Sequence, residues 1–511
     1  MPRVVIIGAG PGGLSCAIAL KRKYGFDNFT IYERGGEVGG TWRASLFGAS
    51  SDVSVAFYSL STDLRDWKGS HGSQKELLDY WVDLAKKYNL YPHILLNHAV
   101  KSVEWDTTNN HYHIVAEDAS TGKSSSSTAE IVISAIGVLD TPRFARIPGL
   151  DTFKGAKFHS ARWDSSVELR GKRVGVIGNG SSATQFVPQI AKDPEVRIIQ
   201  FCRTPSWLLP DNRVQYSQTT RWILRNIPFM MRLYRWILFM RKNFTNYIKS
   251  NAPKKYVDKL VPTYPLACKR LVIDTDYLRA LHQPNLDINW DGIDRIVEDG
   301  ILTKKGIEHI PLDVIIFATG YAADFYPLHV RGKTHTIQEY YEQELGQRHT
   351  LAQLFPTSEL LYDFWFVFRP NTVTGHTSAI FTNEVQRKVS SLEVKLSATD
   401  AYNDKIQALL NNSVWAGCIS WYRVGGDGKI SSLFPGPALR FWLWLRKPDW
   451  RHFSGIFKQR LQLLLRVLIF SGLLALGASR MEMFRAIQTK AFPLARSLLE
   501  SVSKQKSRII G

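Results

Sequence analysis

The hydrophobic positions at the start of the chain predict a strand, a glycine-rich turn, a helix and a second strand. Residues 3–7 form a mostly β-branched apolar run, and residues 8–13 read GAGPGG. Residues 14–23 then repeat apolar side chains at helical spacing, and residues 29–32 form a second apolar run that ends at Glu33. This β-α-β order around a glycine-rich turn is typical of a dinucleotide-binding unit.

The same pattern returns about 170 residues later. An apolar run at residues 173–177 leads into GNGSSA at residues 178–183, which opens a helix. The next apolar run, residues 196–201, ends just before Arg203. Two such units so far apart indicate two nucleotide-binding domains rather than a short internal repeat. The expected fold class is therefore α/β, with two Rossmann-like domains.

Three other stretches have patterns of their own. Residues 107–128 predict a hairpin with a serine-rich tip at residues 124–127, and residues 313–317 predict another buried strand. Residues 215–260 are rich in Trp, Met, Phe, Arg and Lys and predict a helical insertion. This insertion is either a packed helical subdomain with basic side chains at its surface, or a surface that faces a membrane or covers substrate.

These patterns divide the chain into four parts. We expect the first nucleotide domain to be built from residues 1–145 and 313–450, the second from residues 146–312, and a basic helical tail from residues 451–511. The tail contains an apolar stretch, residues 461–478, that Arg466 interrupts. Its uncharged part is shorter than the roughly 20 residues that cross a bilayer. We expect a buried or interfacial helix there, with peripheral contact to an anionic membrane as the functional alternative.

Composition narrows the classes of partner and compartment. The 511 residues include 65 Lys and Arg against 45 Asp and Glu, a net charge of +20, which favours anionic partners such as nucleotide phosphates or a membrane surface. No nucleic-acid-binding motif is visible, so we expect no nucleic-acid partner. The four cysteines show neither CxxC nor zinc-site spacing. We therefore expect no disulfide framework, no metal site and no dithiol redox pair, in a reducing, intracellular and cytoplasmic protein. Because a strand begins almost at residue 1, we expect no cleaved signal peptide.

The first glycine loop is expected to bind FAD or NAD. Gly8, Gly10 and Gly13 would let the backbone approach a pyrophosphate at the start of the following helix. Glu33 lies 20 residues after Gly13, where a carboxylate accepts hydrogen bonds from ribose hydroxyls. A carboxylate at this position would repel a 2′-phosphate.

The second glycine loop is expected to bind NADP. Its candidate contacts are Gly178, Gly180, Ser181, Ser182 and Ala183, with alanine in place of the third glycine. Twenty residues after Ala183 stands Arg203, followed by Thr204, and a cation there suits a 2′-phosphate. Two dinucleotides without a dithiol imply that FAD accepts hydride from NADPH. Dioxygen is the simplest acceptor for the electrons that then leave the flavin.

A motif between the two loops points to a family. Phe153, Gly155, His159, Trp163 and Asp164 fit the pattern FxGxxxHxxxW followed by Pro or Asp. This pattern resembles the fingerprint of the type I Baeyer–Villiger monooxygenases. The related flavin-containing monooxygenases that oxidise nitrogen and sulfur carry an aromatic and a basic residue at the end of it instead.

Further matches to this family run along nearly the whole chain. The resemblance implies that residues 39–42, 52–58 and 319–321 contact the flavin. The candidate FAD contacts in or near these stretches, together with Val103, are Gly40, Thr41, Trp42, Asp52, Tyr58 and Gly320. Late elements at residues 369–371, 375–384 and 417–422 also match, and they resemble fungal members that act in secondary metabolism. The sequence departs from the family at Leu46 and Phe47, where Tyr-Pro is usual, and at Arg369, where Gly is usual.

The resemblance also implies catalytic residues. Lys269 would help to hold the 2′-phosphate, and Arg270 would stand over the flavin, held by Asp52. In this family reduced flavin and dioxygen give a C4a-peroxyflavin that attacks a carbonyl as an anion. A fixed guanidinium stabilises that anion and the oxyanion that follows.

The sequence thus predicts an NADPH-consuming, FAD-dependent Baeyer–Villiger monooxygenase. It would insert one oxygen atom of O2 next to a ketone carbonyl and release an ester or lactone. The expected substrate is a small molecule, an apolar or polyketide-like ketone. The alternative is a flavin-containing monooxygenase that oxidises nitrogen or sulfur, and Trp163, Asp164 and the Lys269–Arg270 pair favour the first.

Overall fold

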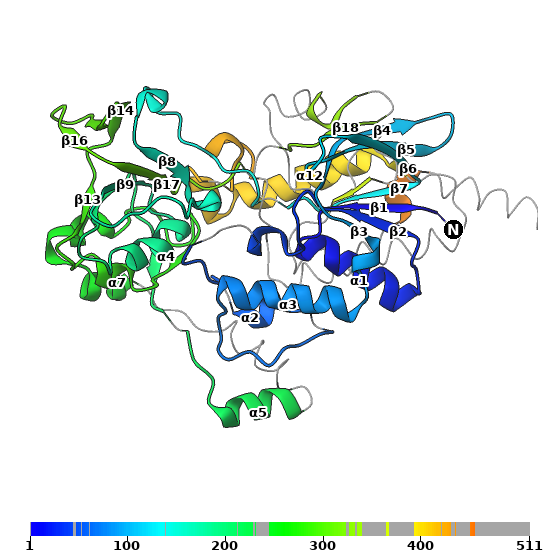
Figure 1. Cartoon of the computed structure of the whole chain (residues 1–511), viewed down its shortest axis with the longest axis horizontal. Coiled ribbons are helices and arrows are strands. Elements are labelled where there is room, and N and C mark those ends of the chain that lie inside the picture. Colours follow the sequence, from blue (N-terminus) through cyan, green and yellow to red (C-terminus); the bar gives the residue numbers. More distant parts are fainter. Residues whose placement is uncertain are drawn as a thin grey trace, which may run out of the picture. The chain divides into compact units, whose positions relative to one another are not determined.

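The computed structural model in Figure 1 describes most of residues 2–454. The residues outside the description are 1, 44–46, 53, 61, 138, 212, 228–229, 231–244, 323–325, 333–334, 340–363, 367–392, 421, 431–434, 436–449 and 455–511. The chain forms two units, Met1–His452 and Phe453–Gly511. Apart from the short strand β21 (Phe453–Ser454), the elements given below belong to the first unit. The predicted tail helix falls outside the described residues.

Five parallel strands form the first sheet, in the order β19-β7-β1-β2-β3. Their bounds are β19 Phe364–Phe366, β7 Ile131–Ser134, β1 Val4–Ile7, β2 Phe29–Tyr32 and β3 Ile94–Leu95. All residues of β1 and β7 are buried, as expected where a parallel sheet is covered on both faces. Helix α1 (Pro11–Tyr24) follows β1, and α3 (Gln74–Lys87) packs beside α1 (Figure 1). The predicted first β-α-β unit is therefore confirmed.

A second parallel sheet has the order β13-β10-β9-β17-β8. Its strands are β13 Leu286–Asn289, β10 Arg197–Phe201, β9 Arg173–Ile177, β17 Val314–Phe317 and β8 Ala156–His159. The predicted buried strand near residue 314 is present, but it lies in the second sheet and not in the first nucleotide domain, where the sequence analysis expects it. It pairs with β9 on one side and β8 on the other, so the chain leaves the second sheet only after Phe317. Four buried apolar residues in a row do not reveal which sheet they join.

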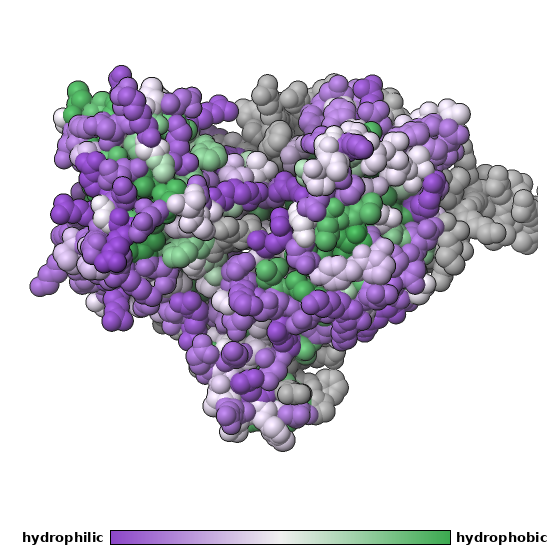
Figure 2. Space-filling view, viewed as in Figure 1, coloured by the Kyte–Doolittle hydropathy of each residue, from purple (hydrophilic) through white to green (hydrophobic). Residues whose placement is uncertain are grey.

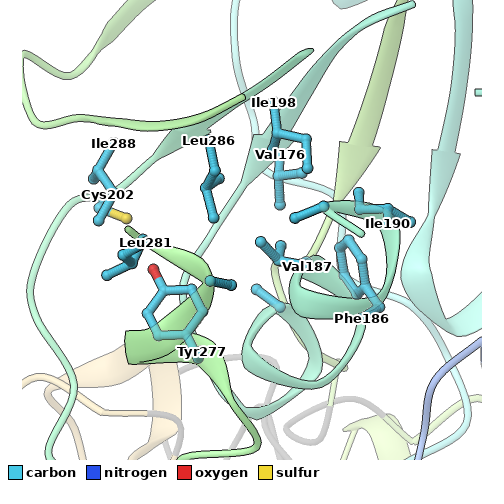
Figure 3. Close-up of a cluster of buried hydrophobic side chains, with 14 of the residues drawn as sticks. Val176, Phe186, Val187, Ile190, Ile198, Cys202, Tyr277, Leu281, Leu286 and Ile288 are labelled. Carbon is cyan, nitrogen blue, oxygen red and sulfur yellow. The ribbon is translucent and has the colours of Figure 1, made fainter. Parts of the chain in front are cut away.

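Helix α4 (Ser181–Ile190) covers one face of the second sheet and closes a hydrophobic core (Figure 3). Phe186, Val187 and Ile190 of α4 point toward side chains from β9, β10 and β13. Tyr277, at the start of α9 (Tyr277–Ala280), is fully buried there and donates its hydroxyl to Gln200 Oε1 at 2.7 Å. This core fixes the position of the helix that begins at the second glycine loop.

Two further sheets contain antiparallel strands. One is a mixed sheet: β4 (His98–Asp106), β5 (His111–Asp118) and β6 (Ser124–Ala129) form an antiparallel meander, and β18 (His329–Arg331) pairs with β4 in parallel. The other is antiparallel and holds β14 (Ile293–Val297), β15 (Gly300–Thr303) and β16 (His309–Pro311). The predicted serine-rich hairpin tip is wrong. Residues 124–127 pair with β5 as an edge strand, because serine side chains can face solvent while the backbone joins the ladder.

The remaining elements are short or lie outside the sheets. They are α2 Val55–Tyr58, α5 Gln218–Asn226, α7 Thr245–Asn251, α8 Val257–Leu260, α12 Leu396–Asn411, β11 Leu208–Leu209, β12 Val272–Ile273 and β20 Glu393–Val394. Ile248 of α7 and Leu260 of α8 are buried in the core of the second sheet, so this end of the predicted insertion is a packed subdomain. Trp222 of α5 is 60% exposed.

The surface of the described chain is mainly hydrophilic in the view of Figure 2, with apolar residues gathered in a few separate areas. Among the described helices, none combines the length and apolar content that crossing a bilayer requires.

One expectation about the cysteines is wrong. Cys268 and Cys418 form a disulfide although 150 residues separate them. No sequence pattern indicates this bond, because only cysteine pairs that are close in sequence show a recognisable spacing. Cys16 and Cys202 are buried, unpaired thiols.

Candidate functional site

The first glycine loop joins β1 to α1 with closely packed backbone. The N–H of Gly8 donates to the carbonyl of Tyr32 at 2.7 Å, which ties the loop to β2. A Cβ on Gly13 would lie 1.9 Å from the carbonyl oxygen of Gly8, so only glycine fits there. Helix α1 begins at Pro11 after Gly10, and no side chain caps its first turn. Its first N–H groups and its dipole can therefore serve an anion such as a pyrophosphate.

Glu33 lies at the end of β2, beside this loop. Its carboxylate accepts hydrogen bonds from the N–H groups of Ala9 and Gly35, both at 2.8 Å, and the residue is 8% exposed. Each carboxylate oxygen has further lone pairs for ribose hydroxyls. Glu33 thus fits the predicted ribose contact and also holds the loop, a role that the sequence did not show.

A second turn approaches the first loop. The short 3-10 helix at Gly40–Trp42 packs against it so closely that a Cβ on Gly40 would lie 2.8 Å from the Cα of Gly10. Thr41 donates its hydroxyl to the carbonyl of Leu139 at 3.1 Å. The ring of Trp42 meets the ring of Tyr58 edge-on, with centroids 5.4 Å apart. The predicted flavin-contacting turn therefore lies against the predicted pyrophosphate loop.

The second glycine loop has the same design with more room. Helix α4 begins at Ser181 after Gly180, again without a side-chain cap. A Cβ on Gly180 would meet nothing within 4 Å, which leaves space for a phosphate over the helix start. Ala183 is fully buried, so the methyl group that replaces the third glycine packs inside the domain. The loop fits a dinucleotide pyrophosphate.

Arg203, Thr204 and Lys269 come together at the end of β10. The ammonium group of Lys269 donates to Thr204 Oγ1 at 3.2 Å. The pKa of Lys269 is lowered, first by burial and second by the positive charge of Arg203. Two cations that repel each other beside a hydroxyl form a site for a small dianion. A 2′-phosphate on the ribose of NADP meets this requirement.

Arg270 forms an ion pair with Asp52, across 218 residues of sequence. The Arg270 side chain is 32% exposed and the Asp52 side chain 19%. Tyr58 donates its hydroxyl to the other oxygen of Asp52 at 3.0 Å, so both carboxylate oxygens are held. The half-buried guanidinium therefore has a fixed orientation, as the resemblance implied.

The fingerprint residues lie between the two cofactor loops. His159 ends β8, pairs with Phe317 in register, and accepts a hydrogen bond from the N–H of Ala161 at its Nδ1. Burial lowers the pKa of His159 to about 4, so its ring is neutral at physiological pH. Gly155 allows close packing, since a Cβ there would lie 2.4 Å from the carbonyl oxygen of Asp313. These residues position backbone and do not supply a charged catalytic group.

Phe47 and Gln185 join the two nucleotide domains, and sequence reasoning missed both roles. The ring of Phe47 stacks on Trp163 with centroids 4.7 Å apart. The amide of Gln185, on α4, bonds both the N–H and the carbonyl of Ser50, at 3.4 and 3.3 Å. Phe47 stands where the family usually has proline, and that departure was its one visible signal.

Other predicted residues have different places. Val103 is fully buried in β4, so its side chain packs in the hydrophobic core of that sheet and does not line an open site. Gly320 adopts a φ of +80° with open space around its Cβ position, as a residue close to a cofactor would. The elements at residues 369–371 and 375–384, and Leu46 and Trp421, lie outside the described residues.

Comparison with known proteins agrees with this geometry. A model of the pyridine nucleotide-disulphide oxidoreductase family matches residues 5–228, less than half of the chain. A Baeyer–Villiger monooxygenase of Pseudomonas aeruginosa is 33% identical over 481 residues, which cover 86% of this chain and 88% of the relative. An FAD-binding monooxygenase of Aspergillus niger is 31% identical over 502 residues, 88% of this chain and 81% of the relative.

A solved structure supports the fold. The cyclohexanone monooxygenase of Rhodococcus sp. Phi1, crystallised with NADP+, superposes with a TM-score of 0.77 at 20% identity. The match covers 89% of this chain and 98% of that one.

Proposed function

This chain belongs to the family of Baeyer–Villiger monooxygenases, and we propose that its oxygen insertion depends on Arg270 as held by Asp52. The enzyme uses FAD and NADPH to insert one atom of dioxygen beside the carbonyl group of a ketone, and it releases an ester or a lactone. The other oxygen atom leaves as water. The observation that carries the proposal is the half-buried guanidinium of Arg270, paired with the carboxylate of Asp52, which Tyr58 holds through its other oxygen.

The two glycine loops are proposed to hold the two cofactors. Bound FAD would accept hydride from NADPH and activate dioxygen. The residues of the chain would bind the two cofactors and orient them toward each other. The proposed FAD contacts are Gly8, Gly10, Gly13, Glu33, Gly40, Thr41, Trp42, Asp52, Tyr58, Val103 and Gly320. The proposed NADP contacts are Gly178, Gly180, Ser181, Ser182, Ala183, Arg203, Thr204 and Lys269. Support comes from the uncapped starts of α1 and α4 and from the cation pair at Thr204.

Arg270 is proposed to stabilise negative charge on oxygen. Insertion places a negative charge first on the attacking oxygen and then on the former carbonyl oxygen, and a preorganised donor lowers the energy of both. The planar guanidinium remains charged at any physiological pH and can keep Asp52 on one edge while its other edge faces the reacting oxygen. Tyr58 fixes the orientation of Asp52 and so of Arg270.

The substrate class and the cellular location are proposed from the sequence. We expect an apolar or polyketide-like ketone, in secondary metabolism, as for the fungal members that the late motifs resemble. We also propose an intracellular, cytoplasmic enzyme with peripheral membrane contact through its basic tail, supported by the net charge of +20. The Cys268–Cys418 disulfide removes one argument for a reducing compartment, the expected absence of disulfide bonds.

A substrate panel tests the proposed function. Purified, flavin-loaded protein is given NADPH and either ketones of increasing size, a tertiary amine or a thioether. We expect NADPH consumption and dioxygen uptake to rise with at least one ketone and a product that is heavier by one oxygen atom, an ester or lactone by mass spectrometry. An N-oxide or sulfoxide without any ester would instead establish the heteroatom-oxidising alternative.

A further inference from the structure

We propose that the Cys268–Cys418 disulfide positions Lys269 and Arg270, so that its redox state sets how completely NADPH oxidation is coupled to oxygen insertion. The proposal rests on the function proposed above. Cys268 directly precedes the two cations, and its Cα lies 5.9 Å from that of Cys418. Cys268 is fully buried and Cys418 is 7% exposed. The bond therefore acts inside the protein, one residue from Lys269 and two from Arg270.

The segment that carries these cations is irregular; besides the disulfide, Tyr264 is bonded to Pro205 and Trp207, Lys269 to Thr204, and Arg270 to Asp52. Between the end of α8 at Leu260 and the start of β12 at Val272, the chain forms neither helix nor strand. Ala267 has a φ of +67°, a conformation that costs energy for a residue with a side chain. In such a segment a covalent bond next to the strained Ala267 restricts the backbone directly, which the side-chain bonds of Lys269 and Arg270 do not.

Cys418 provides that hold from a braced segment. It follows the 3-10 helix Val414–Gly417, which packs against the small core of Ile406, Leu410 and Ile430. The guanidinium of Arg423 donates to the carbonyl of Ala416 at 2.5 Å and to that of Gly428 at 2.8 Å. The disulfide thus fastens an irregular, cation-bearing loop to a segment that a core and an arginine already fix.

The loss of the disulfide would affect the two half-reactions differently. Asp52 would still attract Arg270, but the backbone of residues 267–270 could shift, and a displacement of about 1 Å is enough to impair a reacting geometry. At saturating NADPH, hydride transfer depends mainly on nicotinamide placement, whereas insertion needs the guanidinium at the reacting oxygen. Reduced protein should therefore oxidise NADPH and release more of the oxygen as hydrogen peroxide.

The redox step balances with ordinary reagents. Two thiols and one hydrogen peroxide give one disulfide and two water molecules, and a dithiol reductant returns the pair to thiols while it becomes a disulfide itself. Hydrogen peroxide is the product of uncoupled turnover, so an enzyme with a reduced pair would generate the oxidant that closes it. Burial of both sulfur atoms makes either direction slow without local opening.

Thiol counting and coupling measurements test the proposal. Unfolded protein should show two thiols before reduction, from Cys16 and Cys202, and four after it; four before reduction would overturn the proposal. In the holoenzyme, Cys418→Ser should lower the ratio of ester formed to NADPH consumed by about threefold or more, with peroxide rising to match. Cys16→Ala, which removes a buried thiol in α1, is the control and should keep the ratio of the unmodified enzyme.

A reversible experiment covers a variant that fails to fold. Wild-type holoenzyme treated with a dithiol should lose coupling and regain it after reoxidation, while its flavin content stays constant. Unchanged coupling in reduced wild-type protein would refute the positioning role. If oxidised wild-type protein makes no ester from any ketone, the proposed function fails instead, and the thiol count still shows whether the disulfide exists.

A separate observation points to a metal site far along the sequence from these residues. The geometry assigns Asp106, His111 and His113 as ligands of a zinc-like divalent ion on the β4–β5 hairpin. Nε2 of His113 lies 3.3 Å from Nε2 of His111 and 3.4 Å from Oδ2 of Asp106. Ligand atoms around a tetrahedral zinc ion at 2.0–2.1 Å lie about 3.3 Å from one another. Two of the three distances between ligand atoms match this value; the third, from His111 Nε2 to Asp106 Oδ2, is 4.0 Å.

The chemistry of the donors agrees with this geometry. The carboxylate of Asp106 accepts hydrogen bonds from the N–H of Thr108 at 2.8 Å and from the side-chain amide of Asn109 at 2.7 Å, which orient it beside the two imidazole rings. His111 and His113 stand two apart in β5 and so share a face of the strand, a spacing that differs from the Cys/His spacings of zinc modules. The fourth position would be left to water.

Titration with zinc chloride tests this site on the holoenzyme. Calorimetry should show one zinc ion bound with a Kd in the micromolar range, and a raised melting temperature. His113→Ala should weaken binding at least tenfold, whereas His309→Ala, an exposed histidine that bonds Asp299, should not change it. Absence of saturable binding, or equal binding by His113→Ala, would refute the assignment.

Discussion

Replacement of Arg203 by alanine tests how the chain selects NADPH. The guanidinium of Arg203 lies beside Thr204 and Lys269, where the 2′-phosphate is expected. A hydrogen bond to a charged group contributes about 1.5–3 kcal/mol. Arg203 is exposed, so solvent and salt screen it and the low end applies, about 1.5 kcal/mol or about tenfold in Kd. Lys269 is partly buried and directly bonded to Thr204, so Lys269→Ala should cost more, roughly 30-fold or above.

The same pair of cations predicts a pH effect with a definite sign. The pKa of Lys269 is lowered by burial and by Arg203, so Lys269 loses its proton at a lower pH than an ordinary lysine does. NADPH affinity requires the charged ammonium group and should therefore fall as pH rises through this lowered pKa. Arg203→Ala removes the like charge, which raises the pKa of Lys269. The alkaline decline in affinity should then move to higher pH, although the affinity at neutral pH is weaker.

The assay compares NADPH with NADH over a pH series. The measured quantities are the Kd of NADP+ by calorimetry and the KM of each reduced coenzyme. Arg197→Ala is the matched control, an exposed arginine at the opposite end of β10. NADH lacks the 2′-phosphate, so its KM should change little in either variant. Equal losses with NADH and NADPH, or an alkaline limb that stays in place in Arg203→Ala, would refute the assignment.

Three further predictions concern the flavin, the insertion step and the tail. Gly10→Val puts a branched side chain against Gly40 where the pyrophosphate must approach, and Glu33→Ala removes the ribose acceptor. Both proteins should therefore purify depleted of FAD, as measured by flavin absorbance. A fully yellow Gly10→Val protein would contradict the loop assignment. Arg270→Ala should bind FAD, and stopped-flow experiments should show that NADPH still reduces this flavin. Its rate of ester formation should fall by about 10²–10³-fold while hydrogen peroxide is released, and Arg270→Lys should recover little of the ester formation. Retained ester yield in Arg270→Ala would remove Arg270 from the mechanism. The full chain should float with anionic vesicles at physiological salt if its basic tail binds membranes, and complete recovery in the soluble fraction would reject that idea.

The parts that could be predicted from the sequence are those whose evidence is local. In each glycine loop the strand, the turn and the helix follow one another within some twenty residues, so their spacing alone specifies the loop. Arg203 could be found in the same way, by its distance from Ala183. The pairing of β17 could not, because a run of four buried apolar residues fits either parallel sheet equally well. The disulfide could not either, since nothing near Cys268 indicates a partner 150 residues away.

The contacts that sequence patterns do not reveal join residues far apart in the chain, and they are also the contacts that join the two cofactor domains. Asp52 meets Arg270, Ser50 meets Gln185, and Phe47 stacks on Trp163. The first member of each pair comes from residues 47–52, one short stretch of the first domain, and the second comes from the part of the chain around the NADP loop. Hydride transfer requires the nicotinamide to lie against the flavin, so any change in this stretch alters the distance between the cofactors as well as the hold on Arg270. Substitutions at Phe47 or Gln185 should therefore slow flavin reduction and lower coupling together, whereas loss of Arg270 alone should leave flavin reduction largely intact.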